Sequence, residues 1–479
     1  MRRLTSALGL GVALAATAFS AGCPNREVAA IDPNQQKEEK KLIPVGSNRN
    51  IDILFVIDNS GSMGQEQASL GSNFPLFMSV LRNIEGGLPN VHIGVVSSNV
   101  GVGGYNIPGC LQNGDNGALQ AVGRPLDPNQ PNVNCTDIPT GKPFIEDVTS
   151  DSGTHTINYP DGKLEDTFTC IATLGTKGCG FEQHLESMKR GLDNSNAGNS
   201  AFLRKDAYLA IIIIADEDDC SAVNSAVFDP NDTSLTGTLG PLESFRCTEF
   251  GITCDQGNLT RSAADYTGCR PRTDSPYIRN PQDYVNFVKG LKDDPNLIIV
   301  SGIIGNPDPV RVSIVDGKPK LSASCSSQAN GTADPAVRIK YFLDQFPGST
   351  FTSICNNDLS AALQKIAEAL ARVLGNPCLE GDIATDDLNP DAPGLQIECS
   401  VADVRYPGTE QESSKTIRRC TMQDENTPVA AQDHPCWYAK KDASCVPPSS
   451  QSGLQLLVER DQGADPPTGT YVQASCVSK

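Results

Sequence analysis

The chain alternates short apolar runs with segments in which apolar residues recur every three or four positions. The runs predict strands at residues 53–57, 91–96, 208–214 and 297–300, the first of them buried on both faces, and residues 350–354 predict a further short strand. The periodic segments predict helices with one buried face, at residues 65–82, 181–192, 281–291, 334–341 and 359–370. Strand and helix therefore alternate, which predicts an α/β domain with a mainly parallel sheet and helices on both faces.

Two polar segments interrupt this alternation. Residues from about 100 to 169 and from about 221 to 279 are rich in Gly, Pro, Asn and Asp and contain cysteines, so we expect disulfide-stapled insertions. With these insertions, the α/β domain extends over residues 50–375. Residues 376–479 hold six cysteines and little helical periodicity, which predicts a small Cys-rich β module at the C-terminus.

A polar loop follows the first apolar run directly. Asp58, Ser60 and Ser62 are spaced two apart at the carboxyl end of the predicted strand, where open α/β sheets bind ligands. All three side chains offer the hard oxygens that Mg²⁺ accepts. Gly61 and Gly64 let the backbone turn tightly around a small ion. The alternative is a helix cap, but a cap needs one such residue and not three at fixed spacing.

The Asp-x-Ser-x-Ser sequence formed by Asp58, Ser60 and Ser62, with Gly61 and Met63, resembles the metal-ion-dependent adhesion site of von Willebrand factor A domains. The resemblance implies a doubly wound α/β fold for the domain. It also implies a divalent cation, Mg²⁺ first with Ca²⁺ and Mn²⁺ as alternatives, which keeps an open coordination position. A protein partner would fill that position with an acidic residue, so the implied function is adhesion or assembly.

The family's site uses two further positions. Asp216 follows the next central strand and matches the first of them, where it would hold a metal-bound water. The second position is a threonine, but here Cys179 occupies the matching place. Thr176, three residues earlier, serves only if the loop is displaced, and Glu182 is another possible oxygen donor near the helix start. A disulfide from Cys179, expected to Cys170, would rule out a thiolate ligand.

Three more acidic residues, Glu217, Asp218 and Asp219, follow Asp216 directly. Such a run would raise the affinity for cations, or would suit a larger ion such as Ca²⁺. The simpler interpretation is an acidic loop in contact with solvent. We expect Asp216 to belong to the metal site and Asp218 and Asp219 to belong to a solvated loop.

The N-terminus has the pattern of an export signal. Arg2 and Arg3 precede an apolar stretch at residues 8–19, which is too short to span a bilayer. Small residues follow this stretch. We therefore expect a secretory signal peptide at residues 1–22.

The small residues directly before Cys23 resemble a bacterial lipobox, so we expect Cys23 to be lipidated. Ser20 stands where Leu or Val is more usual, and plain secretion is the alternative. The lipid would anchor the protein to the cell envelope, at the outer membrane because Pro24 follows and not Asp. Residues 23–49 are polar and predict a tether between the anchor and the folded domain.

Composition supports export and excludes some partners. The chain has 38 Lys and Arg against 57 Asp and Glu, a formal net charge of −19, which argues against nucleic acid and anionic lipid as partners. We therefore expect membrane contact through the lipid anchor only. Lipidation of Cys23 would leave an even number of the 17 cysteines, which suits disulfides within local groups. No Cys-x-x-Cys pair occurs among them, so zinc is not expected.

These patterns leave three functional hypotheses. The first is a metal-dependent binding protein of the cell envelope. The second is a structural envelope protein with a vestigial metal site, which the altered threonine position and the many cysteines favour. The third is a hydrolase that uses Ser60, but Ser60 lacks a Gly-x-Ser-x-Gly elbow and no His stands in a recognisable catalytic motif. We therefore expect no enzymatic activity.

Overall fold

The structure is a computed structural model of the 479-residue chain. It describes residues 38–44, 49–84, 87–110, 112–126, 139–150, 153–374, 378–379, 381–384, 392–407, 411–442, 445, 450–461, 466 and 470–478. The expected signal peptide and the lipidation site at Cys23 lie outside these residues. None of the described helices is long and apolar enough to cross a membrane.

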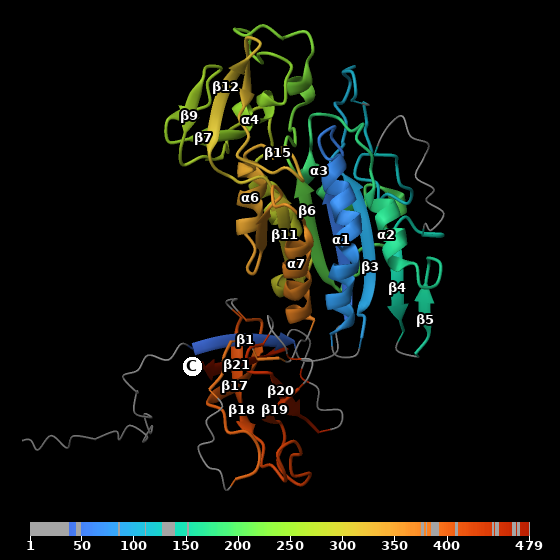
Figure 1. The fold of residues 1–479 in the computed structure, drawn as a ribbon, viewed down its shortest axis with the longest axis vertical. Coiled ribbons are helices and arrows are strands. Elements are labelled where there is room, and N and C mark those ends of the chain that lie inside the picture. The colour runs from blue at the N-terminus through green and yellow to red at the C-terminus, as the bar shows by residue number, and fades with distance from the viewer. Residues whose placement is uncertain are drawn as a thin grey trace, which may run out of the picture.

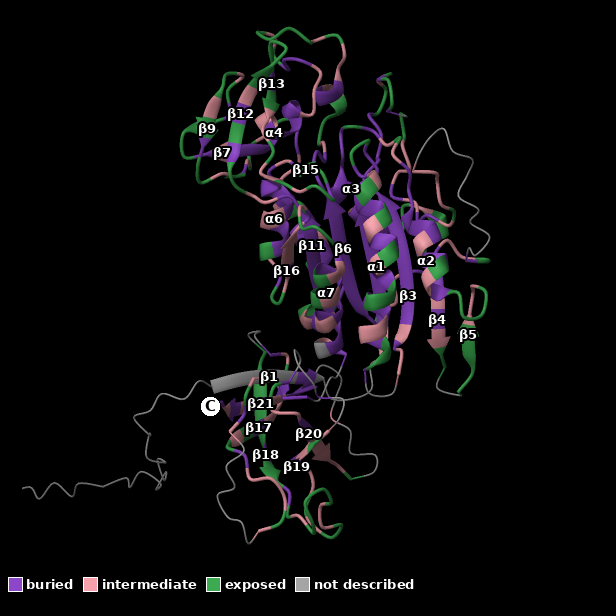
Figure 2. Ribbon diagram, viewed as in Figure 1, coloured by how far each residue is buried: buried purple, intermediate pink, exposed green. Residues whose placement is uncertain are grey.

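A seven-stranded sheet forms the centre of the molecule (Figure 1), in the order β16-β11-β6-β2-β3-β4-β5. Its strands are β2 (Asn50–Ile57), β3 (Asn90–Ser97), β4 (Ile145–Thr149), β5 (His155–Ile157), β6 (Tyr208–Ala215), β11 (Ile298–Ile304) and β16 (Thr350–Ser353). The strands from β16 to β3 run parallel, and β4 and β5 add an antiparallel edge. Strands β2, β3, β6 and β11 are buried along nearly their whole length, as Figure 2 shows for β3, β6 and β11, which explains why their sequences are continuous apolar runs.

Helices cover both faces of this sheet. On one face lie α1 (Gly64–Arg82), α2 (Leu164–Ala172) and α7 (Ser360–Val373), and on the other lie α3 (His184–Leu192), α5 (Pro281–Lys289) and α6 (Val337–Asp344). Alternate residues of β2 divide between the two cores: Phe55 packs with the first group of helices, whereas Leu54 and Val56 pack with the second. The predicted α/β domain with a mainly parallel sheet is therefore observed.

The predicted insertions contain more regular structure than their composition indicated. Within residues 100–169, β4 and β5 extend the main sheet and α2 covers it. Residues 221–279 belong to an upper subdomain, at the top of Figure 1, that also includes a hairpin which the sequence did not reveal. The subdomain comprises η2 (Ser225–Phe228), α4 (Phe245–Gly251), β7 (Ile252–Cys254), β8 (Gly257–Asn258), β9 (Ala264–Tyr266), β10 (Arg270–Pro271), β12 (Val310–Val315) and β13 (Lys318–Leu321).

The C-terminal residues form the expected Cys-rich β module, below the main sheet in Figure 1. Its six strands, in spatial order, are β1 (Glu38–Pro44), β21 (Thr470–Val477), β17 (Cys399–Arg405), β18 (Ser413–Arg419), β19 (Cys436–Lys441) and β20 (Leu454–Glu459). The prediction that residues 23–49 are a tether is wrong for β1, which pairs along its whole length with β21. A strand from the opposite end of the chain therefore forms one edge of the module's sheet.

Each disulfide among the described residues joins two cysteines of the same group along the sequence, as their grouping predicted. Among the described residues they are Cys110–Cys179, Cys220–Cys247, Cys254–Cys269, Cys325–Cys355, Cys378–Cys445, Cys399–Cys476 and Cys420–Cys436. Three of them lie in the C-terminal module. Crosslinks of this number form and persist in an oxidising compartment, so the protein is an extracellular or cell-surface protein.

Candidate functional site

Asp58 is the first residue after β2 and is fully buried. Its backbone N–H donates to the Ile214 carbonyl at 3.0 Å, which places it beside the end of β6. Its Oδ1 accepts hydrogen bonds from the Ser60 N–H at 2.7 Å and from the Ser98 hydroxyl at 3.3 Å. The carboxylate is thus held in one orientation by the loop that follows it and by the end of β3.

Ser60 and Ser62 lie on the same loop, with their hydroxyl oxygens 3.1 Å apart. Ser60 is buried, whereas Ser62 is exposed. The loop therefore presents a carboxylate and two hydroxyls in a line that begins in the interior and ends at the surface.

Asp216 is the first residue after β6 and is 3% exposed. It lies next to this loop because β2 and β6 are parallel neighbours that end at the same edge of the sheet. The Ser62 side chain is within hydrogen-bonding reach of its carboxylate. Burial, reinforced by the negative charges of Asp58 and Glu217, raises the pKa of Asp216 to about 9. The structure therefore brings together four of the predicted residues, Asp58, Ser60, Ser62 and Asp216.

Thr176 lies beside the same loop, but its hydroxyl is already engaged. The Thr176 methyl group would be 3.4 Å from a Cβ added at Gly64, so the two segments are in contact. Its hydroxyl donates to the Leu126 carbonyl at 2.9 Å. Thr176 is thus close to the Asp58 loop, but its hydroxyl is already hydrogen-bonded elsewhere.

The loop at residues 175–179, called here the Gly178 loop, packs tightly against the Asp58 loop. The Gly178 N–H donates to the Asn59 carbonyl at 2.8 Å, and an added Cβ at Gly178 would lie 2.3 Å from Asn59 Oδ1. Only glycine allows this approach. Gln67 of α1 joins the two loops, because its amide donates to the carbonyls of both Asp58 and Gly175 at 3.0 Å.

Cys179 ends the Gly178 loop and is bonded to Cys110. The predicted pairing of Cys179 with Cys170 is wrong, and Cys170 is itself in another disulfide. The conclusion drawn from that pairing still holds, since a disulfide sulfur does not supply a thiolate ligand.

Asp218 and Asp219 do not form a solvated loop, contrary to the sequence prediction. Asp218 accepts hydrogen bonds from the N–H groups of Arg338 and Ile339 in the first turn of α6. Asp219 is 1% exposed and forms an ion pair with Arg338 at 2.9 Å. Both carboxylates are therefore structural, and burial of the first turn of α6 beside them explains why they are not solvated.

The sequence did not single out His184, the first residue of α3. It is fully buried, and its Nε2 lies 3.4 Å from Asp58 Oδ2, without hydrogen-bond geometry. Burial alone would lower the pKa of His184, but the Asp58 carboxylate outweighs it and the pKa is raised. No local pattern could reveal this contact, because it depends on how α3 packs against β2.

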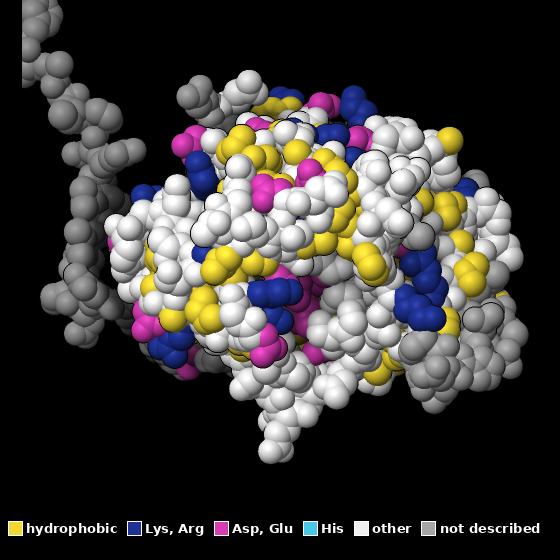
Figure 3. All heavy atoms as spheres, turned by 90° about the horizontal axis from the view of Figure 1, so that it is seen from above, with side chains coloured by type: hydrophobic (Ala, Val, Ile, Leu, Met, Phe, Trp, Pro, Cys, Tyr) yellow, Lys and Arg dark blue, Asp and Glu magenta, His cyan; other side chains and the backbone are white. Residues whose placement is uncertain are grey.

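Several buried polar atoms at this edge have no hydrogen-bond partner among the described residues. They include Asp58 Oδ2, Asp216 Oδ1, Asn59 Oδ1 and Glu182 Oε1. Buried polar atoms are nearly always paired, and an unpaired carboxylate oxygen costs folding free energy. Seen from above in Figure 3, acidic side chains lie recessed near the centre of this end of the molecule. Oxygens of this kind suit a cation.

Among the described residues, no group of three His, Cys, Asp or Glu side chains is already gathered around a metal position. A site made of one carboxylate and two hydroxyls does not require such a group. The residues present therefore fit a small, hard cation through Asp58, Ser60 and Ser62, with Asp216 beside them.

The comparisons with known proteins show no family. No family model and no curated protein matches the sequence. Among solved structures, the chain is similar to the pilus adhesin SpaC of Lactobacillus rhamnosus GG, with 12% identity over 93% of this chain and a TM-score of 0.32. The pilus adhesin RrgA of Streptococcus pneumoniae gives 10% identity over 91% of this chain and a TM-score of 0.28.

A third similar structure is the conserved hypothetical protein BatB of Bacteroides thetaiotaomicron, with 8% identity over 67% of this chain, 98% of BatB, and a TM-score of 0.25. The chain spans 43% of the length of SpaC and 57% of that of RrgA. Similarities at these TM-scores carry no functional argument. What this site does must be inferred from its own geometry.

Proposed function

We propose that this is a cell-surface binding protein whose α/β domain has the von Willebrand factor A fold and holds a divalent cation, Mg²⁺ first, at the end of β2. Asp58, Ser60 and Ser62 would be its direct ligands, and Asp216 would act through a water. The observation that carries the proposal is the pair of buried carboxylate oxygens, Asp58 Oδ2 and Asp216 Oδ1, that have no hydrogen-bond partner among the described residues.

The order of these side chains supports binding at the surface. The Ser60 N–H and the Ser98 hydroxyl orient the buried Asp58 carboxylate, and Ser62 lies at the surface. A cation bound there would supply a positive charge with a coordination position left for a carboxylate. The partner would be a protein that offers an Asp or Glu side chain, which this acidic chain would otherwise repel.

The position of the site also fits a surface role. In Figure 1 the parallel strands point toward the upper subdomain, so their carboxyl ends lie on the side of the sheet opposite the C-terminal module. A lipid on Cys23 would be attached 15 residues before β1, so the membrane would lie on the side of the module. The metal site would then face away from the membrane, which would be the outer membrane.

The test uses the full mature chain. Isothermal titration of chelator-treated protein with Mg²⁺ should give one site that Asp58→Ala abolishes and that Asp161→Ala, a substitution of an exposed aspartate, leaves unchanged. Capture of envelope proteins by the immobilised chain should then depend on Mg²⁺ and on Asp58. A wild-type chain that binds no Mg²⁺, Mn²⁺ or Ca²⁺ at this edge would contradict the proposal.

A structural role with a vestigial metal site is the second candidate. The engaged Thr176 hydroxyl favours it, because this hydroxyl donates to Leu126 and not toward the Asp58 loop. Under this alternative, Asp58→Ala would change the stability of the protein and leave capture of partners unaltered.

We propose no catalytic role for Ser60. Its hydroxyl is 3.1 Å from that of Ser62, and His184, the buried imidazole at this end of the sheet, contacts Asp58. Nucleophilic catalysis needs a base within hydrogen-bonding reach of the serine. Labelling of Ser60 by a serine-directed fluorophosphonate would overturn this view.

A further inference from the structure

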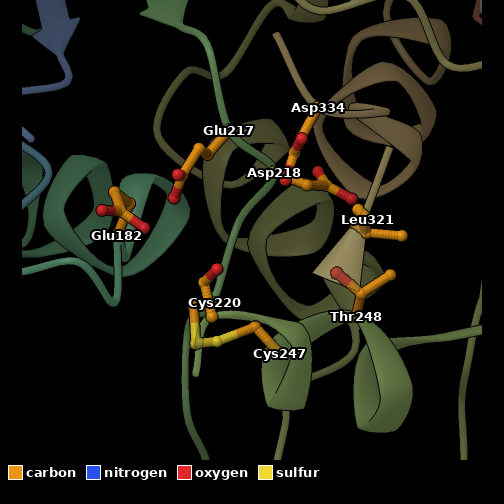
Figure 4. A pocket seen from close by; sticks show the side chains of 9 residues that line it. Glu182, Glu217, Asp218, Cys220, Cys247, Thr248, Leu321 and Asp334 are labelled. Carbon is orange, nitrogen blue, oxygen red and sulfur yellow. A yellow bond between two sulfur atoms is a disulfide. The ribbon is translucent and has the colours of Figure 1, made fainter. Parts of the chain in front are cut away.

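A second acidic pocket lies beside the proposed Mg²⁺ site and shares none of its residues. It is small and partly open to solvent, and it lies between the start of α3, the segment after β6 and the upper subdomain. Figure 4 shows its walls, including the Cys220–Cys247 disulfide. The pocket is therefore bounded by three parts of the chain that are far apart in the sequence.

Four carboxylates line this pocket. Glu182 comes from the segment before α3, Glu217 and Asp218 follow β6, and Asp334 precedes α6. The nine residues that line the pocket include no Lys, Arg or His. The Glu217 side chain extends toward Glu182 in Figure 4. The negative charge of the pocket is thus not balanced by a basic side chain in its walls.

Glu182 is the observation that distinguishes this pocket from an ordinary acidic cluster. Its side chain lines the pocket and is 2% exposed; it is within hydrogen-bonding reach of Glu217, but its Oε1 has no hydrogen-bond partner among the described residues. The backbone holds it firmly, since the Glu182 carbonyl accepts a hydrogen bond from the Cys220 N–H at 2.7 Å. Burial, together with the charges of Glu217 and Asp58, raises the pKa of Glu182 well above its ordinary value.

We propose that this pocket is a second cation site, specific for Ca²⁺, in which Glu182, Glu217 and Asp334 are the protein ligands. Ca²⁺ accepts six to eight oxygens in flexible geometry, which suits carboxylates supplied by three separate segments with water. Asp218 stays outside the coordination shell because it accepts the N–H groups at the start of α6. This inference does not depend on the function proposed for the Asp58 site.

The three carboxylates do not yet converge on one point, as no described group of three acidic side chains is gathered in metal geometry. A bound Ca²⁺ would draw them together. Thr248 of α4 and Leu321 of β13 also line the pocket, so the ion would fix the upper subdomain to the carboxyl edge of the sheet.

The competing explanation is that Glu182 and Glu217 share one proton and bind no ion. Calorimetric titration of the chelator-treated full chain with Ca²⁺ separates the two. We expect a site that Glu182→Gln weakens by at least about tenfold. Asp58→Ala should leave this site unchanged, so failure here differs from failure at the Mg²⁺ site. Glu425→Gln, a substitution of an exposed glutamate in the C-terminal module, is the matched control.

Thermal unfolding provides a second readout. Ca²⁺ should raise the melting temperature of the wild type and of Glu425→Gln but not of Glu182→Gln or Asp334→Asn. If Glu182→Gln leaves Ca²⁺ binding unchanged and only stabilises the chelated protein, Glu182 and Glu217 share a proton and the proposal is overturned. Loss of the Ca²⁺ site in Asp58→Ala alone would also overturn it, because the ion would then belong to the first site.

Discussion

Each end of strand β2 has a buried aspartate, one near the start of the strand and one directly after it, but the two have different partners. At the amino edge, the Asp52 carboxylate accepts hydrogen bonds from the Arg204 N–H and from Arg204 Nε, both at 2.7 Å. At the carboxyl edge, six residues later in the same segment, Asp58 Oδ2 has no hydrogen-bond partner among the described residues. Both side chains are fully buried. Burial of an acidic side chain is thus no sign of function; what distinguishes Asp58 is that, among the described residues, its Oδ2 has no arginine beside it and lies 3.4 Å from His184 without a hydrogen bond.

The same contrast recurs within the acidic run after β6. Asp219 is neutralised by Arg338, and Asp216, three residues earlier, has a carboxylate oxygen without a partner in the described structure. A paired buried charge mainly stabilises the fold once its partner is present. A buried carboxyl group without such a partner stays protonated at neutral pH, as the raised pKa of Asp216 indicates, unless a cation supplies the counter-charge.

Asp52→Ala should destabilise the protein most. It removes one member of a buried pair and leaves the Arg204 guanidinium uncompensated, which costs about 3–5 kcal/mol. Urea unfolding with chelator present measures this loss. Mg²⁺ affinity should stay unchanged in the folded variant. A loss of stability below about 1 kcal/mol would mean that the paired edge is not the stabilising one.

Replacing both Cys110 and Cys179 with Ser should lower stability by about 2–4 kcal/mol, because the disulfide closes a long loop. It should also lower Mg²⁺ affinity, since Cys179 fixes the Gly178 loop against Asn59. Unfolding and metal titration measure the two effects. The matched control replaces Cys420 and Cys436 in the C-terminal module, where stability should fall and Mg²⁺ affinity should not. Equal effects on Mg²⁺ affinity would contradict the role of the loop.

Glu66→Gln should stabilise the chelated protein at high pH. Burial, with the Asp58 charge adding to it, raises the pKa of Glu66 in the folded protein to about 7 from an ordinary 4.5. A raised pKa means that the folded state loses stability as pH rises through 7, when the buried carboxyl ionises. The gain should be about 1 kcal/mol at pH 8 and small at pH 5. Chemical unfolding at both pH values checks it, and an equal gain at both would contradict the cause.

Thr176→Val should have the smallest effect. It removes one hydrogen bond to the Leu126 carbonyl and keeps the shape of the side chain, so stability should fall by about 1 kcal/mol or less. Mg²⁺ affinity should change by less than about threefold. A loss of tenfold or more in calorimetric titration would place the Thr176 hydroxyl on the metal, as the sequence resemblance implied.

The sequence predicted those features whose determinants are local. The apolar run at residues 53–57 and the polar loop behind it are adjacent in the chain, so Asp58, Ser60 and Ser62 could be identified together. Asp216 could be found because it follows another buried run, and parallel strands end at one edge.

What the sequence missed depends on contacts between distant segments. The pairing of β1 with β21 joins the two ends of the described chain, and the polar sequence of β1 gave no sign of a strand. Cys110 could pair with any of several cysteines, since sequence alone does not determine disulfide connectivity. The structural roles of Asp218 and Asp219 require α6 and Arg338, which lie more than 100 residues later.

The most direct test of the central claim is anomalous diffraction from crystals of the mature chain soaked in Mn²⁺, which substitutes for Mg²⁺ and scatters anomalously. We expect one strong peak among the Asp58 carboxylate and the hydroxyls of Ser60 and Ser62, and its absence from crystals of Asp58→Ala. A map without a peak at this edge, or with the same peak in the variant, would contradict the account.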